Sequence, residues 1–168
     1  MPTHRLLLIR HAQAADAPAD RDRPLTAKGT RAAAAIGAWL QQAGYVPDRV
    51  LVSSALRAQQ TWAAAAETLG SAPEPTVDPR IYDNTVEAVL DVIGEVSDDT
   101  GTVAVVGHNP SMGELAFSLD DGTGSDSARR KLHAGFPTGA VAVFRLETSF
   151  ADLAPGRATL GDLTVPGR

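Results

Sequence analysis

The chain has 168 residues, of which 43% are hydrophobic and 21% are charged, and its formal net charge at pH 7 is −5. This length predicts a single domain over residues 1–168, and the acidic balance provides no bulk attraction to nucleic acid or to an anionic membrane, so neither is expected as a partner. The lack of cysteine excludes disulfides, thiolate metal sites and cysteine nucleophiles, and together with the shortness of the first apolar run it favours a cytoplasmic location.

Strands and helices are predicted to alternate along the chain. Short apolar runs predict strands, and windows in which apolar residues recur every three or four positions predict helices. The predicted elements are a strand at 6–9, a surface loop at 14–29, a helix at 30–43, a strand at 50–52, a helix at 55–69, an extended or loop segment at 73–79, a helix at 85–96, a strand at 102–106, a helix at 110–119, a connecting loop at 120–127, and strands at 139–146 and 158–163. This order predicts an α/β three-layer sandwich with a mainly parallel central sheet, in which the two late strands are candidates for an antiparallel edge pair.

Residues with known capping preferences mark several helix ends. Gly44 follows the first predicted helix and is expected to be its C-terminal cap. Ser53 and Ser54 precede the second helix and are expected to cap its N-terminus. Asn109 and Pro110 are expected to be the N-cap and the first residue of the helix that follows the third predicted strand.

Three predicted strands end beside a cation or an imidazole. The first strand runs directly into Arg10 and His11, and the second is followed by Arg57 in the first turn of the next helix. His108 follows the third strand. Ligands of open α/β sheets bind outside the carboxyl ends of the strands, and guanidinium groups and helix N-termini both favour phosphate, so this placement predicts an oxyanion site.

Each of these residues alone has an ordinary structural explanation. An ion pair would account for Arg10, a solvent-facing helix position for Arg57, and a packing role for either histidine. These explanations do not account for four such residues at equivalent strand ends. His4 and His133 lie elsewhere in the pattern and are expected to be structural or surface residues.

Four motifs resemble those of the histidine phosphatase superfamily, in its phosphoglycerate-mutase-like branch. They are RHA at 10–12, PLTAKG at 24–29, SSALRAQQT at 53–61 and VVGHNP at 105–110. The compact length, PLTAKG and the GHNP form are similar to the small SixA-type phosphohistidine phosphatases. The resemblance runs from the N-terminus to about Leu146.

The resemblance implies a phosphoglycerate-mutase-like fold and a phosphatase that needs no metal or other cofactor. His11 would be the nucleophile that forms a covalent phosphohistidine, and Arg10, Arg57 and His108 would hold the phosphoryl oxygens. Two guanidinium groups and a protonated imidazole would stabilise the charge of the transition state. The expected substrate is phosphohistidine in a protein, or a small phosphomonoester.

Two features depart from the family pattern. Ala12 stands where the family usually has Gly, so the turn after His11 is not expected to need a positive φ. The general acid is uncertain: Asp83 is the first candidate, with Glu87 and Asp16 as alternatives. Asp83 could equally be the N-cap of the helix at 85–96. An imidazole leaving group accepts a proton readily and depends least on such an acid, which favours phosphohistidine as the substrate.

Other functions remain open from the sequence. A phosphate-binding or interaction module with little turnover would keep the same four residues. A phosphomutase would need to enclose and reorient its product, and the short segment between Arg57 and His108 leaves no long insertion for a lid. A metallohydrolase using His11 and His108 is not supported by any motif with metal-ligand spacing, and no metal site is predicted.

Overall fold

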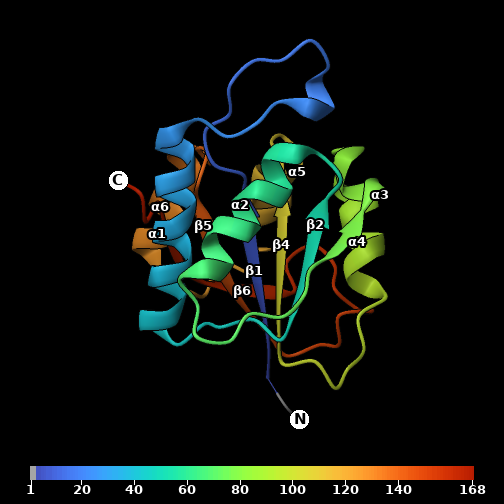
Figure 1. Ribbon diagram of the computed structural model, residues 1–168. Coiled ribbons are helices and arrows are strands. Elements are labelled where there is room, and N and C mark those ends of the chain that lie inside the picture. Colours follow the sequence, from blue (N-terminus) through green and yellow to red (C-terminus); the bar gives the residue numbers. More distant parts are fainter. Residues whose placement is uncertain (1–2) are drawn as a thin grey trace.

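Residues 3–168 are described by the computed structural model shown in Figure 1. These residues form one six-stranded sheet in the order β3-β2-β4-β1-β5-β6. The strands are β1 (His4–Arg10), β2 (Arg49–Ser53), β3 (Thr76–Asp78), β4 (Thr102–Gly107), β5 (Val141–Leu146) and β6 (Ala158–Thr164). Strands β1 to β4 run parallel, whereas β5 pairs antiparallel with β1 and β6 antiparallel with β5. The predicted α/β class, with a mainly parallel sheet and an antiparallel edge pair, is confirmed.

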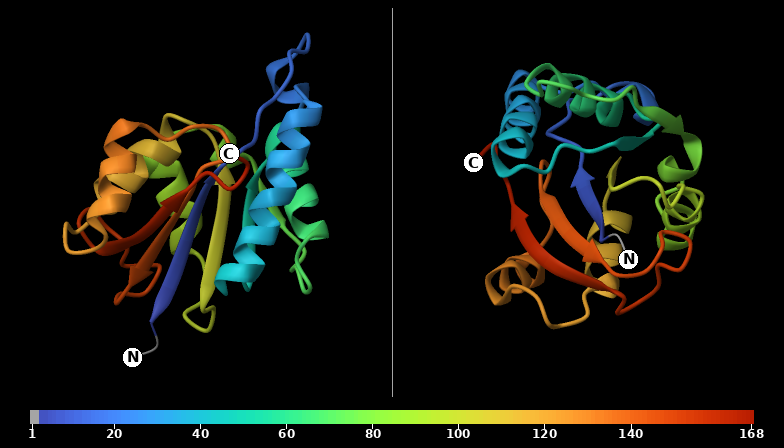
Figure 2. Two further views of the ribbon diagram at one scale, coloured as in Figure 1. Left: turned by 90° about the vertical axis from the view of Figure 1, so that its left-hand side faces the viewer. Right: turned by 90° about the horizontal axis from the view of Figure 1, so that it is seen from below.

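Helices cover both faces of the sheet, which gives the predicted three layers (Figure 2). Helices α1 and α2 pack on one face, and α4, α5 and α6 pack on the other. The helices are α1 (Ala27–Ala43), α2 (Leu56–Glu67), α3 (Pro79–Tyr82), α4 (Val86–Gly94), α5 (Ser111–Leu119) and α6 (Asp126–Ala134), with a 3₁₀ turn η1 (Asp20–Asp22). Within residues 3–168, none of these helices combines the length and the apolar character that a membrane crossing requires.

Strand β1 is buried on both faces because its apolar side chains alternate between two cores. Leu6 and Leu8 pack with the α4–α6 side, whereas Leu7 and Ile9 pack with the α1–α2 side. All four side chains are almost completely buried. Burying each such side chain stabilises the fold by about 1.5–3 kcal/mol, so the strand that ends at Arg10 is firmly anchored.

Several predicted helix ends differ from the observed ones. Helix α1 begins at Ala27 because the Thr26 hydroxyl caps it by accepting from the Gly29 N–H. Helix α5 begins at Ser111, and Pro110 is its N-cap in place of Asn109. The amide oxygen of Asn109 nevertheless accepts from the N–H of Gly113, inside the first turn. The predicted roles of Asn109 as N-cap and Pro110 as first helical residue are therefore wrong by one position, although the Asn109 side chain still bonds to the first turn.

The predicted Ser cap of the second helix is wrong. Ser53 is the last residue of β2, and the observed N-cap of α2 is Ala55, which makes no side-chain capping bond. Helices α3 and α6 were not predicted. Helix α6 buries only Ala128 and Leu132, so its sequence is too polar to show the recurring apolar residues from which the other helices were predicted. Gly44 caps α1 with a φ of 80°, as predicted.

The segment 12–26 links β1 to α1 and rises above the carboxyl edge of the sheet (Figure 1). The Thr26 N–H donates to the carbonyl of Gln13 at 3.0 Å, which closes the base of this segment. Gly29 packs against the same carbonyl so closely that an added Cβ would lie 2.0 Å from its oxygen. Residues of the PLTAKG motif therefore hold the backbone that directly follows His11.

Candidate active site

Parallel pairing brings two of the predicted site residues side by side. Arg10 at the end of β1 is in register with Gly107 at the end of β4, so His11 and His108 are the next residues of adjacent strands. The backbone N–H of His11 donates to the Gly107 carbonyl at 3.0 Å. The two imidazole rings lie 5.2 Å apart between centroids, with an interplanar angle of 56°.

His11 is buried and held in one tautomer. Its Nδ1 lies 2.7 Å from the carbonyl oxygen of Ala12. A carbonyl oxygen can only accept, so Nδ1 carries the proton and Nε2 keeps its lone pair. Burial, followed by the charges of Arg57 and Arg10, lowers the pKa of His11 to about 4, so the ring is neutral at pH 7. This is the protonation state that a histidine nucleophile needs.

Thr61 fixes the turn that follows His11, and it was not singled out from the sequence. The N–H of Ala12 donates to the Thr61 hydroxyl at 3.0 Å, and this hydroxyl donates to the carbonyl of Arg57 at 2.7 Å. Thr61 is almost completely buried. The same side chain thus ties the peptide that orients His11 to the helix that carries Arg57. Ala12 fits this turn without a positive φ, as expected.

His108 is buried and shares a 2.8 Å hydrogen bond between its Nε2 and the Ser53 hydroxyl. The Ser53 oxygen also accepts from the N–H of Ala55 at 3.2 Å, so its own proton is available to Nε2. Burial, followed by the proximity of His11 and Arg57, lowers the pKa of His108 to about 3. His108 is therefore neutral at pH 7 in this structure, whereas a protonated ring was expected. The expectation overlooked how strongly burial disfavours the charged form.

Arg57 reaches the site from the first turn of α2, where it contacts a carboxylate that the sequence analysis missed. Its two terminal nitrogens donate to Asp20, one to the backbone carbonyl at 2.8 Å and one to Oδ2 at 3.2 Å. The Tyr82 hydroxyl donates to the same Oδ2 at 2.7 Å. The bond from Tyr82, followed by that from Arg57, lowers the pKa of Asp20 to about 2, although burial opposes the shift. Asp20 is thus an ionised carboxylate at the edge of the cluster.

Several N–H groups of the cluster have no partner. Arg10 donates to the carbonyl of Phe136 at 3.1 Å, and no carboxylate within residues 3–168 forms an ion pair with it. Its Nε is buried without a hydrogen bond among the described residues, as are Nε of Arg57 and Nδ1 of His108. Buried polar groups rarely lack partners, so these three nitrogens favour an added acceptor such as an oxyanion oxygen, which would reach them once the side chains shift, because none is accessible in the structure.

The candidate acids are not joined to this cluster. Asp83 is exposed at the carboxyl end of α3, next to Tyr82, and among the described residues its carboxylate makes no hydrogen bond or ion pair. It is not the N-cap of α4, because the Thr85 hydroxyl accepts from the Ala88 N–H instead. Asp16 and Glu87 are also exposed. The role of Asp83 as proton donor stays a prediction.

Asn84 supports the loop after His108. Its backbone has a φ of 62°, a conformation that Asn tolerates better than most residues. Its side-chain amide donates to the carbonyl of Asn109 at 2.8 Å, and its amide oxygen accepts from the N–H of Ser111 at 3.1 Å. Asn84 therefore links α3 to the GHNP segment, a role that only the tertiary structure reveals.

Other predicted features lie outside the cluster. His4 is buried in β1, with Nδ1 2.9 Å from the carbonyl of Thr100, and His133 is exposed on α6. Residues 120–127 form part of the connection to α6 and the first residues of that helix. Within residues 3–168, no three His, Cys, Asp or Glu side chains are grouped so that they could hold a metal ion.

The sequence is similar to that of known proteins. Residues 6–84 match the family model described as the histidine phosphatase superfamily (branch 1). An uncharacterized protein of Mycobacterium tuberculosis is 38% identical, over 94% of this chain and 99% of its own. The phosphohistidine phosphatase SixA of Escherichia coli is 31% identical, over 70% of this chain and 75% of its own.

Solved structures give the same result. A protein of Nakamurella multipartitia that is assigned as a phosphohistidine phosphatase SixA superposes with a TM-score of 0.86 and 34% identity, over 98% of this chain and 96% of its own. The protein histidine phosphatase SixA in complex with tungstate superposes with a TM-score of 0.78 and 27% identity, over 96% of this chain and 97% of its own. The similarity therefore extends over nearly the whole chain.

Proposed function

The chain belongs to the histidine phosphatase superfamily and is a SixA-like phosphatase, and we propose that it acts without a metal through a phosphohistidine intermediate on His11. The proposed substrates are phosphohistidine in proteins and small phosphomonoesters. One observation carries this proposal. A neutral, tautomerically fixed His11 lies beside His108, and Arg10, Arg57 and His108 each bring a buried N–H that has no partner among the described residues.

The proposed reaction has two displacements at phosphorus. Nε2 of His11 attacks the phosphoryl group, an Nε2–P bond forms, and the bond from phosphorus to the leaving group breaks. Water then attacks the phosphohistidine, which releases inorganic phosphate and returns Nε2 to its neutral state. Arg10, Arg57 and His108 hold the phosphoryl oxygens in both steps, so the protein contributes mainly position and positive charge.

Binding of phosphate would change the charge of the site. The pKa of His108 is low in this structure because the ring is buried near other positive groups. A phosphate dianion beside it would favour the protonated form and raise this pKa. His108 would then become the cation that the transition state needs, while the proton of His11 stays on Nδ1 beside the Ala12 carbonyl.

Asp83 is the carboxyl group proposed to protonate the leaving group. Asp20, the carboxyl that contacts Arg57, is held ionised by its bonds from Tyr82 and Arg57 and serves as the comparison. Replacing each by Asn separates them. Loss of turnover on an alkyl phosphate, with turnover on phosphohistidine retained, identifies the acid, because an alkoxide needs protonation more than an imidazole does.

The proposal is tested by trapping the phosphoenzyme. We expect a ³²P-labelled phosphodonor, added in the presence of EDTA, to label the chain with an adduct that is labile in acid and stable in alkali, at His11. The His11→Ala variant should remain unlabelled and inactive. Turnover that EDTA abolishes, or turnover that persists in His11→Ala, would refute the mechanism. Stable binding of phosphate without labelling or turnover would instead support a phosphate-binding module.

A further inference from the structure

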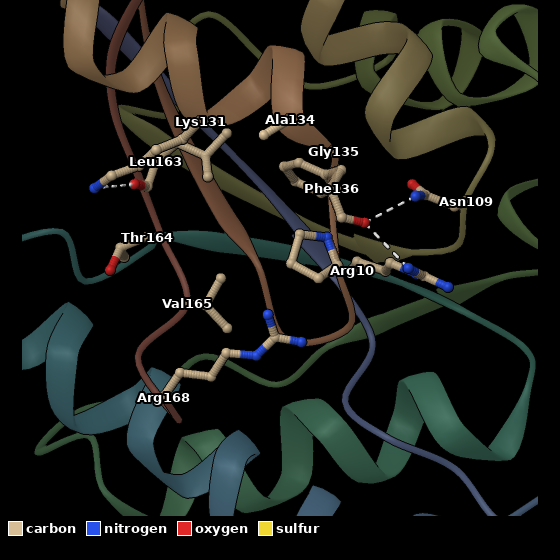
Figure 3. Close-up of a pocket in the computed structure, with 11 residues that line it drawn as sticks. Arg10, Asn109, Lys131, Ala134, Gly135, Phe136, Leu163, Thr164, Val165 and Arg168 are labelled. Carbon is tan, nitrogen blue, oxygen red and sulfur yellow. Dashed lines mark hydrogen bonds between the residues drawn. The ribbon is translucent and has the colours of Figure 1, made fainter.

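A pocket opens beside Arg10, the residue that precedes His11. It has a volume of about 650 Å³ and lies between the segment that follows α6 and the last residues of the chain. Arg10, one of the four residues of the phosphoryl site, lines this pocket, and so does Asn109, the residue after His108 (Figure 3). This volume lies within the range of small-molecule binding sites. A group attached to the bound phosphoryl would therefore find space directly beside Arg10.

The pocket is positively charged. Lys131 and Arg168 line it together with Arg10, and no Asp or Glu side chain occurs among the described residues of its lining. Within residues 3–168, none of these three cations forms an ion pair. In a chain with a net charge of −5, three cationic side chains with no Asp or Glu side chain among the described lining residues favour an anionic occupant.

Lys131 and Arg168 both retain free donors. The ammonium of Lys131 donates once, to the carbonyl of Leu163 at 3.2 Å, which leaves its other N–H groups available. Lys131 also lies in the last turn of α6, where a cation stabilises the helix dipole. Among the described residues, Arg168 makes only a backbone hydrogen bond, from its N–H to the carbonyl of Val165, and its guanidinium extends into the space between Val165 and Arg10 (Figure 3). The helix dipole accounts for Lys131 but not for Arg168.

The rest of the lining is apolar. Phe136, Leu163 and Val165 contribute to the walls, and Phe136 and Leu163 are themselves buried. A lining of this kind suits a leaving group with an apolar body and a charged end.

We propose that the pocket binds a second anionic group, a carboxylate or a phosphate, carried by the leaving group of a small phosphate ester. This inference rests on the proposed function, because the phosphoryl group must be held at His11 for its leaving group to reach Lys131 and Arg168. Among the proposed small phosphomonoesters, it favours those that carry a second anionic group and an apolar body between the two charges.

The test compares two substrates that differ in one charge. They are 3-(4-phosphonooxyphenyl)propionate and its neutral primary amide, whose phenol leaving groups are nearly equally acidic. We expect kcat/KM to be several-fold higher for the acid at low salt, and the difference to shrink as salt is added. Lys131→Gln and Arg168→Gln should each reduce the acid-to-amide ratio by about two- to fivefold, the size typical of exposed ion pairs.

A control and a binding assay complete the design. Arg130→Gln removes an exposed cation from the same helix, outside this pocket, and should leave the ratio unchanged. Calorimetric binding of the two corresponding phosphonates, which cannot be hydrolysed, tests the pocket even if the chain fails to turn over either ester. Equal affinity for the two phosphonates, or an equal loss of selectivity in Arg130→Gln, would overturn the inference. Absence of labelling at His11 would overturn the proposed function instead.

Discussion

Replacing Asp20 by Asn is expected to strengthen the binding of phosphate-like anions. The Asp20 carboxylate takes one donor of Arg57, with Nη2 to Oδ2 at 3.2 Å, and its side chain is 53% exposed. An oxyanion that uses the same guanidinium must compete with this carboxylate and is repelled by it. The Asn side chain keeps the shape and can still accept from Tyr82, but it removes the charge.

The magnitude follows from two contributions. A half-exposed ion pair such as this one contributes about 0.5 kcal/mol. The Asp20 carboxylate and a singly charged anion roughly 5 Å apart, on either side of the guanidinium, would repel each other by about 0.8 kcal/mol in water. For a dianion the repulsion would be up to twice as large before salt screening. Together these contributions amount to about 1–2 kcal/mol, or a gain in affinity of roughly five- to thirtyfold.

Tungstate, titrated calorimetrically at low salt, measures this affinity without turnover. Asp22→Asn is the matched control, because Asp22 lies in the same 3₁₀ turn, is exposed, and forms no ion pair among the described residues. The gain in affinity should fall as salt is added. Unchanged or weaker tungstate binding in Asp20→Asn, or an equal gain in Asp22→Asn, would refute the competition between Asp20 and the anion.

Three further predictions concern the support of the site. Thr61→Val leaves the buried Ala12 N–H without an acceptor, so we expect a loss of about 1–3 kcal/mol of stability in urea unfolding and a lower kcat, both largely restored in Thr61→Ser. Gly29→Ala places a Cβ 2.0 Å from a backbone oxygen two residues after His11, so the melting temperature and activity should both fall. Gly44→Ala strains a cap with a φ of 80° at the other end of α1, so it should lower the melting temperature and leave activity unchanged. In the folded chain His11 and His108 have pKa values of about 4 and about 3, against 6.5 when unperturbed, so the unfolded chain binds more protons below pH 6.5. The free energy of unfolding should therefore fall from pH 6.5 towards pH 4, by up to about 1.4 kcal/mol per pH unit for each histidine. His108→Asn should make this dependence on pH less steep.

The sequence predicted that Arg10, His11, Arg57 and His108 lie at the carboxyl edge of the sheet, because this placement depends on local patterns. A buried parallel strand has a recognisable apolar run, and the residue after it must lie at the carboxyl edge of the sheet. In the structure, Arg10 pairs with Gly107, and this pairing places the next residues, His11 and His108, side by side. The strand order needed tertiary structure, but the edge on which these residues meet did not.

Residues that act through long-range contacts could not be identified in this way. Asp20 lies in a segment where acidic and basic residues alternate, and only the folded path of residues 12–26 selects it as the partner of Arg57. Ser53 was assigned as a helix cap because Ser is a common cap, whereas its hydroxyl bonds to His108 from the neighbouring strand. Thr61 is near Arg57 in sequence, but its bond to Ala12 spans two elements.

His11 and Arg57 differ in how much each must rearrange before a phosphoryl group can bind. His11 is already neutral and oriented by Ala12, so little reorganisation is needed at the nucleophile. Arg57, in contrast, is bonded to Asp20, and this bond must loosen when a phosphoryl group takes the guanidinium. Asp20 belongs to the segment that begins directly after His11, so the exchange at Arg57 couples substrate binding to the position of that segment. We therefore expect the Asp20 carboxylate to limit the affinity for an anion, and we expect it to have no such effect on the protonation and orientation of His11.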